Sequence, residues 1–268
     1  MRQLKHISAS SLILHAKNPR RWCLSYLEGM KEPKTKAALL GTEVHRYIES
    51  CLLGVPIQNL DSQSQQITDL YLHQYYREEP LYDLKGVEIP IETRLESSSL
   101  PIVGTIDLWK THKETGQVII EDHKTISSLM KEGKYLYGET EQTLGLNWQV
   151  CLYAWMAGGS ENDIIVRHNQ FRKAKNPDTE EDQLISFSQI ERMLTKKEIC
   201  AIINIIKAEI GQMMQTVHDY TEQGLVAIKA TPENRRWYGR QDPWWPILSG
   251  QMTVEQFKNG GKQKEQWT

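Results

Sequence analysis

The sequence has few cysteines, few phenylalanines and no long apolar run. Its 268 residues include 4 cysteines and 3 phenylalanines. The cysteines are widely and irregularly spaced, which excludes the dense disulfide framework of a small secreted domain. No apolar signal segment opens the sequence, so we expect a protein of a reducing, cytoplasmic compartment.

Long apolar runs and an excess of charge are missing as well. The stretch 199–206 is interrupted by Asn204 and is far shorter than the roughly 20 residues of a membrane-spanning helix. We therefore expect no membrane partner. The formal net charge is −2, which argues against nonspecific coating of nucleic acid and still permits a local basic channel.

Two hydrophobic periods divide the chain. Helical spacing predicts helices in the N-terminal third, and a serine among residues 8–11 is expected to cap the first of them. These helices are expected at 12–17, 20–28, 37–53 and 65–77. Alternation then predicts strands near 87–91, 102–108, 118–120 and 164–171. A helix is expected at 141–157, and a long one from Ser188 to about Gln223. The combination indicates an α/β fold with a mixed central sheet flanked by helices.

Two acids are expected to face each other on one hairpin. Side chains alternate along a strand, so Asp122 and Lys124 share a face. If the turn is centred on Glu114-Thr115, Asp107 lies directly opposite Asp122. Opposed like charges are destabilising, and a divalent cation held with the His123 carbonyl oxygen would compensate them. Taken singly, each feature is better explained without a functional site, by an ordinary Asp122–Lys124 salt bridge and by a solvent-facing Asp107. The hairpin geometry favours a functional site.

Three further residues fit the same site. His45 follows Gly41 by one helical turn, and the missing side chain at Gly41 would leave room for a metal or phosphate. Gln149 and Tyr153 are spaced to project from one helix face toward a phosphodiester. A lone helical histidine or a single polar pair is more often structural, so these residues gain weight only in combination.

In this order the motifs resemble the RecB-type branch of the PD-(D/E)XK nucleases. The matching motifs are Gly41-x-x-x-His45, Gly104-x-x-Asp107, Asp122-x-Lys124-Thr125 and Gln149-x-x-x-Tyr153. The resemblance covers about residues 7–171 and implies a restriction-endonuclease-like core. It places an N-terminal helical cap carrying His45 at 1–85, the nuclease core at 86–176, a C-terminal helix completing the core at 177–229 and a Trp/Arg-rich tail at 230–268.

The resemblance also implies chemistry. His45, Asp107, Asp122 and the His123 main-chain carbonyl would ligate Mg²⁺ or Mn²⁺. Lys124 would orient or deprotonate water and offset transition-state charge, and Gln149 and Tyr153 would position Lys124 and the phosphate. An upstream strand glutamate usual in the family is either Glu88 or Glu92, and the sequence does not choose between them.

One departure concerns iron and sulfur. AddB-type and CRISPR-adaptation nucleases carry an iron-sulfur cluster on one N-terminal and three C-terminal cysteines. Here Cys23 stands near the first position, but no cysteine follows Cys200. Since a cluster needs about four converging thiolates, we expect none, with tryptophans anchoring the tail instead.

DNA with a single-stranded end is the expected partner, and a recombination or single-strand-binding protein is a further candidate. The function implied is a DNA exonuclease of recombination, repair or phage DNA processing in a bacterial or phage-infected cytoplasm. The rivals are a nicking or structure-specific endonuclease and a noncatalytic nucleic-acid-binding module. DNA contacts are expected from Ser10, Arg20, Arg21, Arg172 and Lys173, in basic segments suited to the phosphate backbone.

Overall fold

The computed structural model comprises two compact units, each described here separately. The first contains residues 1–32, 94–102 and 205–268, and the second contains 33–93 and 103–204. The structure describes residues 3–31, 36–57, 62–95, 98–127, 130–131, 134–135, 138–175, 182–231, 236–237, 240–241 and 243–260. The boundaries predicted at residues 85, 176 and 229 concern function and stay a prediction.

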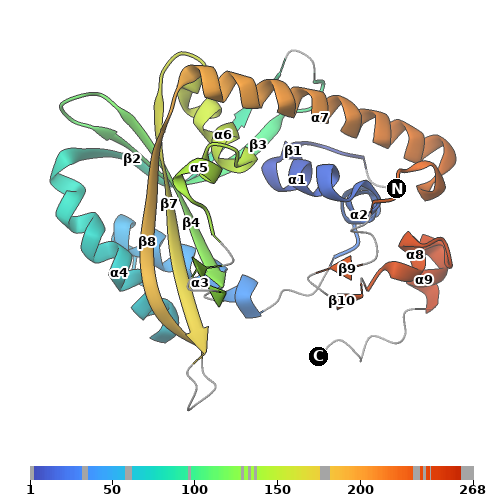
Figure 1. The fold of residues 1–268 in the computed structure, drawn as a ribbon, viewed down its shortest axis with the longest axis horizontal. Helices are drawn as coiled ribbons and strands as arrows, with labels where there is room; N and C mark the ends of the chain where they lie inside the picture. Colours follow the sequence, from blue (N-terminus) through green and yellow to red (C-terminus); the bar gives the residue numbers. More distant parts are fainter. Residues whose placement is uncertain are drawn as a thin grey trace. The chain divides into compact units, whose positions relative to one another are not determined.

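A mixed sheet forms the frame of the second unit, as predicted (Figure 1). Within this unit the strand order is β2-β3-β4-β7-β8. Strands β3 and β4 form an antiparallel hairpin, β4 and β7 run parallel, and β7 and β8 are antiparallel. The strands are β2 Tyr82–Thr93, β3 Ile102–His112, β4 Val118–Ser127, β7 Ile164–Lys175 and β8 Asp182–Leu194. A separate pair is formed by β5 Met130–Lys131 and β6 Lys134–Tyr135.

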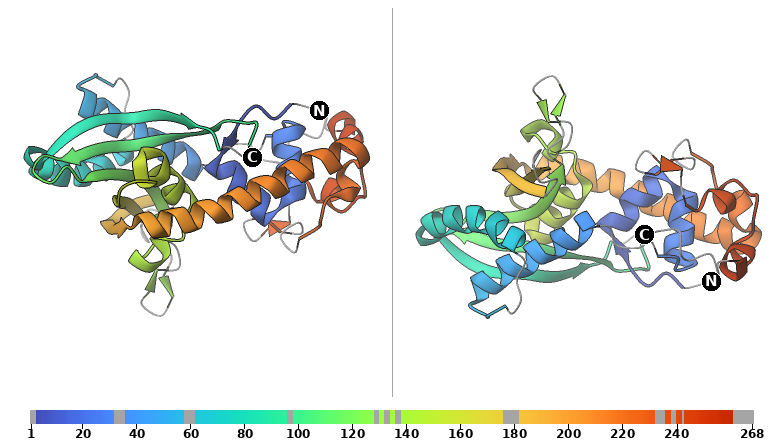
Figure 2. Two further views of the ribbon diagram at one scale, coloured as in Figure 1. Left: turned by 90° about the horizontal axis from the view of Figure 1, so that it is seen from above. Right: turned by 90° about the horizontal axis from the view of Figure 1, so that it is seen from below.

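Helices cover both faces of this sheet (Figure 2). Helices α3 and α4 lie on one face, and the short helices α5 and α6 lie on the other. Since neighbouring strand residues point to opposite faces, each helix pair meets a different set of β4 side chains. The helices are α3 Lys36–Leu53, α4 Ser62–Glu78, α5 Glu141–Leu144 and α6 Trp148–Ala154, followed by the π-helix η3 Trp155–Gly159.

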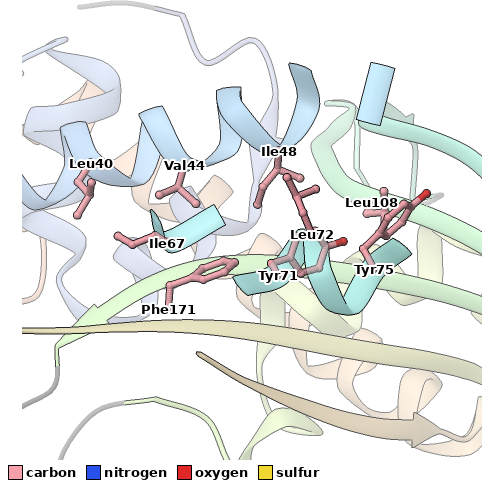
Figure 3. Close-up of a cluster of buried hydrophobic side chains, with 9 residues drawn as sticks. All are labelled: Leu40, Val44, Ile48, Ile67, Tyr71, Leu72, Tyr75, Leu108 and Phe171. Carbon is pink, nitrogen blue, oxygen red and sulfur yellow. The ribbon is translucent and has the colours of Figure 1, made fainter. Parts of the chain in front are cut away.

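The apolar core under α3 and α4 fixes these helices on the sheet (Figure 3). Leu40, Val44 and Ile48 lie on one face of α3, at the spacing predicted from the sequence, and are buried. They pack with side chains of α4, β3 and β7, namely Ile67, Tyr71, Leu72, Tyr75, Leu108 and Phe171. Burying an aliphatic side chain contributes about 1.5–3 kcal/mol, so this stripe holds the helix that carries His45.

The first unit is built from N-terminal helices and the C-terminal segments. Ser8 caps the first helix and forms a capping box with Ser11. Asn18 ends that helix and caps the next, and Gly29 has the positive φ of 67° expected of a helix-terminating glycine. The elements are β1 Ile7–Ser8, α1 Ala9–Lys17, α2 Pro19–Trp22, the π-helix η1 Cys23–Leu27, the 3₁₀-helix η4 Leu225–Ala227, β9 Arg236–Trp237, β10 Arg240–Gln241, α8 Trp245–Leu248 and α9 Val254–Gly260.

Aromatic packing anchors part of the tail, as expected. Trp244 is buried and packs with Leu24, Ile247 and Leu248, and the Arg21 guanidinium lies 4.4 Å from the centre of its ring. The Trp237 side chain lies outside the described residues.

The long helix predicted from Ser188 is wrong at its start. Residues 182–194 form β8, which pairs with β7 along its whole length. The helix α7, Lys196–Gln223, begins eight residues later than predicted. Thr195 and Glu198 form a capping box at this point, because the Thr195 N–H donates to Glu198 Oε2 and Thr195 Oγ1 accepts from the Glu198 N–H.

The single helix predicted over 141–157 is interrupted. Its first segment ends at Gly145, where a Cβ would lie 2.4 Å from Arg192 Nη1. Asn147 then caps α6 by accepting from the backbone N–H groups of Gln149 and Val150. Because α6 starts afresh at this cap, Gln149 points toward the sheet from the first turn of a helix.

Among the helices that the structure describes, none combines the length and the hydropathy needed to cross a membrane.

Candidate functional site

The candidate site lies where the ladder between β3 and β4 stops. The paired residues run from Thr111↔Val118 to Leu108↔Glu121, which confirms the predicted turn and sets Asp107 across from Asp122. Beyond this point the His123 backbone bonds to side chains and not to the backbone of β3. Its N–H donates to Asp107 Oδ2 at 2.6 Å, and its carbonyl accepts from His45 Nε2 at 2.9 Å.

His45 connects three elements at this opening. Its Nδ1 donates to Glu88 Oε1 at 2.8 Å and lies 3.7 Å from Asp107 Oδ1. Burial alone would lower the pKa of His45, but Glu88 and Asp107 raise it to about 9. The imidazolium therefore supplies a positive charge between two carboxylates and a carbonyl oxygen.

The structure brings Glu88, and not Glu92, to this group. The ligand atoms of His45, Glu88 and Asp107 all lie within 4.8 Å of one another, whereas Glu92 is exposed. Glu88 has a φ of 48°, in the left-handed region that glutamate rarely adopts. Such strain concentrates at functional sites, and here it accompanies the contact of Glu88 with His45.

The two acids of the hairpin have opposite environments. Burial and the neighbouring Asp122 carboxylate raise the pKa of Asp107 to about 7. Burial also disfavours ionised Asp122, but Lys124 and His168 hold its pKa well below the usual range. Asp107 therefore has too little positive charge near it, whereas the negative charge of Asp122 is better compensated.

Lys124 and Gln149 both contact the same oxygen of Asp122. Lys124 Nζ donates to Asp122 Oδ1 at 2.7 Å, and Gln149 Nε2 donates to the same oxygen at 3.1 Å. Although burial opposes the charged form, Asp122 and Asp107 raise the pKa of Lys124. Lys124 is thus held as an ammonium group.

Two glycines let side chains and helices approach closely. A Cβ at Gly104 would lie 2.4 Å from Cε1 of Tyr153, so the glycine makes space for the ring on β3. A Cβ at Gly41 would lie 3.2 Å from Thr125 Oγ1. The expectation of open space for a ligand beside Gly41 is therefore wrong, because α3 approaches β4 there and Thr125 fills the gap.

A polar run inside β7 escaped the sequence interpretation. Arg167, His168, Asn169 and Gln170 are all at least nine-tenths buried in a central strand. His168 is level with Asp122 across the parallel pair, and its Nε2 lies 3.3 Å from Asp122 Oδ2. Four consecutive polar residues within a buried strand depart from the usual apolar composition of such strands. This departure is the signal in the sequence that could have pointed to His168.

The opposite face of β4 holds a charged network around Glu121. Lys110 Nζ lies 2.6 Å from Glu121 Oε1. Tyr71 and Asn169 donate to Glu121 Oε2 at 3.0 and 2.6 Å. The second cation is Arg167, whose Nη1 lies 3.6 Å from Glu121 Oε1. We call Lys110, Glu121, Arg167, Tyr71 and Asn169 the Glu121 network. The His123 side chain lies on this face too, and burial lowers its pKa to about 3.

The residues expected to contact DNA lie in varied settings. Arg20 donates to the carbonyls of Ile228 and Leu248 at 2.8 and 2.7 Å, and Arg21 is buried against Trp244. These contacts are internal to the first unit. In the second, Arg172 is 6% exposed and donates to Gln170 Oε1 at 2.8 Å. Ser10 is exposed, and the Lys173 side chain lies outside the described residues. The prediction that these residues bind DNA stays a prediction.

The four cysteines are free thiols. Cys23 and Cys151 are buried, and burial raises the pKa of each to about 12. Over the described ranges, the compact group of metal-ligating side chains found near β3 contains no cysteine. The prediction that the protein holds no iron-sulfur cluster is left for experiment.

The site residues fit a divalent cation of the Mg²⁺ or Mn²⁺ type. The compact group offers two carboxylates and an imidazole, a donor set that suits Mn²⁺ and, through its oxygens, Mg²⁺. Beside it, Asp122 Oδ2 is buried without a hydrogen-bond partner among the described residues. A buried carboxylate oxygen in that state favours a cation. The compact group does not include Asp122, whose other oxygen is bound by Lys124 and Gln149.

Comparison with solved structures gives similarity at low identity. A protein from Eubacterium rectale, named "Putative exonuclease", matches with a TM-score of 0.52 and 13% identity over 85% of both chains. An alkaline exonuclease from Laribacter hongkongensis matches with a TM-score of 0.34 and 12% identity over 84% of this chain and 96% of that one. The first match supports a shared fold. No curated protein matches the chain.

The sequence profile of one family covers most of the chain. The profile of the PD-(D/E)XK nuclease superfamily matches residues 6–218, a range that includes the hairpin acids, His45 and α6. The chain belongs to the PD-(D/E)XK nuclease superfamily.

Proposed function

We propose that this protein is a Mg²⁺- or Mn²⁺-dependent deoxyribonuclease that degrades DNA from a single-stranded end. The observation that carries the proposal is the group formed by His45, Glu88 and Asp107 beside Asp122 and Lys124. It combines ligands for a hard cation with the ammonium group of Lys124, which lies 2.7 Å from Asp122 Oδ1. Phosphodiester hydrolysis needs both, because negative charge develops on the phosphoryl oxygens.

The cation would be held by His45, Glu88, Asp107, Asp122 and the His123 carbonyl oxygen. When bound, it would polarise the phosphate and lower the pKa of a water molecule. The chain itself aligns the ligands: the His123 N–H fixes Asp107 Oδ2, and Gln149 fixes Asp122 Oδ1. To bind a cation, His45 must lose the proton from one ring nitrogen, and with it the contact to Glu88 or to the carbonyl oxygen.

Lys124 is proposed to stabilise charge on the phosphate and to orient water. Its raised pKa favours this role over removal of a proton. Tyr153 lies over Gly104, and burial raises its pKa, so its neutral hydroxyl can donate to a phosphate oxygen. The Asp122, Lys124 and Gln149 contacts would keep the ammonium group in place before substrate binds.

The need for a DNA end is the finer part of the proposal. Its support is the helix α3, which brings His45 over the end of β4 and would favour a strand threaded into the site. Side-on binding of an uninterrupted strand is the endonuclease alternative. A noncatalytic DNA-binding module is disfavoured because Asp107, Asp122 and Lys124 are all retained and in contact range.

The test uses end-labelled single-stranded DNA, linear and covalently closed circular, with and without Mn²⁺. Asp122→Ala should abolish cleavage, and Lys124→Ala should slow it about 100–1000-fold. Glu114→Ala, in the exposed turn of the same hairpin, is the matched control and should cleave normally. Full activity of folded Asp122→Ala would reject the site. Equal initial rates on linear and circular DNA would replace the exonuclease with an endonuclease, and binding without metal-dependent cleavage would favour the noncatalytic module.

A further inference from the structure

His168 lies in the middle of β7 and faces the same side of the sheet as Asp122. The two residues are directly level across the parallel pair of β4 and β7. His168 is 4% exposed, so its ring is inside the protein and close to the candidate site. The sequence placed it only in a basic segment, and the family motifs described above do not include it.

The His168 ring and Asp122 share one unsatisfied contact. Nε2 lies 3.3 Å from Asp122 Oδ2, which is long and poorly aligned for a hydrogen bond. Asp122 Oδ1 already accepts from Lys124 and Gln149. Within the described part of the chain, neither Oδ2 nor the ring's Nδ1 has a hydrogen-bond partner. Catalytic contacts are often long in the free protein and tighten in the complex.

The surroundings decide which ring nitrogen carries the proton. A proton on Nε2 gives Asp122 Oδ2 a donor and leaves Nδ1 as a bare acceptor. A proton on Nδ1 would bury an unsatisfied donor and direct the lone pair of Nε2 at the carboxylate, and both are unfavourable. The Nε2–H form is therefore the one that this site stabilises.

We propose that His168 is a positioning residue that holds Asp122 Oδ2 for the divalent cation. This inference rests on the proposed metal-dependent function. It identifies His168 as the residue that hydrogen-bonds to the metal ligand Asp122 without itself contacting the cation. A carboxylate oxygen has two lone pairs, so Oδ2 can accept from Nε2–H while it binds the cation. Outer partners of metal ligands typically change metal affinity or activity by about 10–100-fold when they are removed.

Three substitutions separate a hydrogen-bond role from a packing role. His168→Gln can place an amide N–H near the position of Nε2, whereas His168→Asn places one near Nδ1. His168→Leu removes both and keeps an apolar side chain of similar size. Hydrogen bonding through Nε2 predicts that glutamine rescues and that asparagine and leucine do not, although all three remove the imidazole.

The readout is Mn²⁺ affinity without DNA, measured from the electron paramagnetic resonance signal of free Mn²⁺. Leucine and asparagine should weaken affinity about 10–100-fold and lower kcat, while KM for DNA and the metal-free melting temperature stay near wild type. Glutamine should stay within a few-fold of wild type. Wild-type affinity in His168→Leu, or equal loss in all three variants together with lowered melting temperatures, would overturn the proposal. If the wild-type protein itself bound no Mn²⁺, the proposed function would fail and the positioning role with it.

Discussion

The two faces of β4 place adjacent acids in contrasting surroundings. Glu121 and Asp122 are neighbours in sequence and both are buried. On the Glu121 side, Lys110 and Arg167 supply two positive charges, and Tyr71 and Asn169 donate hydrogen bonds. Although burial opposes ionisation, these partners lower the pKa of Glu121 to about 2. Glu121 Oε1 has no hydrogen-bond partner within the described residues, but Lys110 and Arg167 balance the charge of Glu121 without any ligand. We call this side the complete face in that sense.

The Asp122 side is incomplete by comparison. Asp107 and Asp122 raise each other's cost of ionisation, and the pKa of Asp107 reaches about 7. Asp122 Oδ2, like Glu121 Oε1, lacks a hydrogen-bond partner within the described residues, but the group nearest to it is the His168 ring at 3.3 Å, whereas Glu121 Oε1 has the Lys110 ammonium at 2.6 Å. The difference teaches how to separate a structural acid from a functional one: the structural acid is neutralised by the chain, whereas the functional acid leaves a deficit that a cation fills.

Removing a cation from the complete face should have the largest effect on stability. Lys110→Met leaves Glu121 with one charged partner inside the protein, and losing one member of a buried ion pair costs about 3–5 kcal/mol. Urea unfolding at pH 7 measures this loss. Lys113→Met, at the exposed end of the same hairpin, is the control and should change stability little. A loss of under about 1 kcal/mol in Lys110→Met would show that the Glu121 network is not the main support of this face.

Acid should weaken the complete face in a defined window. Folded Glu121 ionises at about pH 2, while its ordinary value is 4.5. Its stabilisation is therefore fully present above about pH 4.5 and is lost as the pH falls toward 2, by about 3 kcal/mol in total. The stability gap between wild type and Glu121→Gln should be widest at pH 7 and narrow below pH 4.5. A constant gap from pH 7 to pH 3 would contradict the prediction.

Neutralising Asp107 on the incomplete face should raise the free energy of unfolding, whereas the changes on the complete face lower it. The pKa of Asp107 is raised from 3.8 to about 7, so the cost of this residue to the folding free energy grows as the pH rises from about 4 and is complete above about pH 7. Asp107→Asn keeps an acceptor for the His123 N–H and removes the charge. At pH 8 with a chelator, we expect an unfolding free energy higher by roughly 1–3 kcal/mol, together with loss of DNA cleavage. Lower stability than wild type under these conditions would mean that Asp107 is already neutralised by the chain.

The smallest effect is expected at the residue that serves both faces. His123 offers its N–H and carbonyl to the site, while its side chain lies on the Glu121 side. His123→Leu keeps the backbone groups and should cleave DNA within a few-fold of wild type. His45→Leu is the matched control and should lose Mn²⁺ affinity, because there the ring itself contacts the site. Loss of Mn²⁺ affinity in His123→Leu would mean that the His123 imidazole, and not only its carbonyl oxygen, takes part in the site.

The sequence predicted those parts of the site that depend on local geometry. Asp107 and Asp122 lie on one hairpin, so their register follows from the position of the turn, and the observed strand pairs confirm it. His168 and Asp122 meet across a parallel pair, whose register depends on a crossover that no local pattern determines. Likewise, nothing in the sequence predicts the left-handed backbone at Glu88, because glutamate normally avoids that conformation. The choice between Glu88 and Glu92 therefore required the structure.

The error at β8 has a related cause. Ser188 resembled a helix cap followed by apolar residues at mixed spacing, and the pattern 188–194 suits either element. Pairing with β7 along its full length selected the strand. The true cap at Thr195 and Glu198 was present in the sequence, but tertiary pairing, and not local preference, decided where the helix begins.

The turn and the strand of the hairpin that carries both acids differ in how well they tolerate an added residue. The turn 113–115 is exposed and lies at the opposite end from the site, so an added residue there lengthens a loop. An added residue between Val118 and Glu121 would shift the rest of β4 by one position and turn every later side chain to the other face. Glu121 would then take the position of Asp122 in the site, and Asp122 would take that of His123, on the side of the Glu121 network. Strand length, as much as residue identity, therefore keeps two neighbouring acids in different roles.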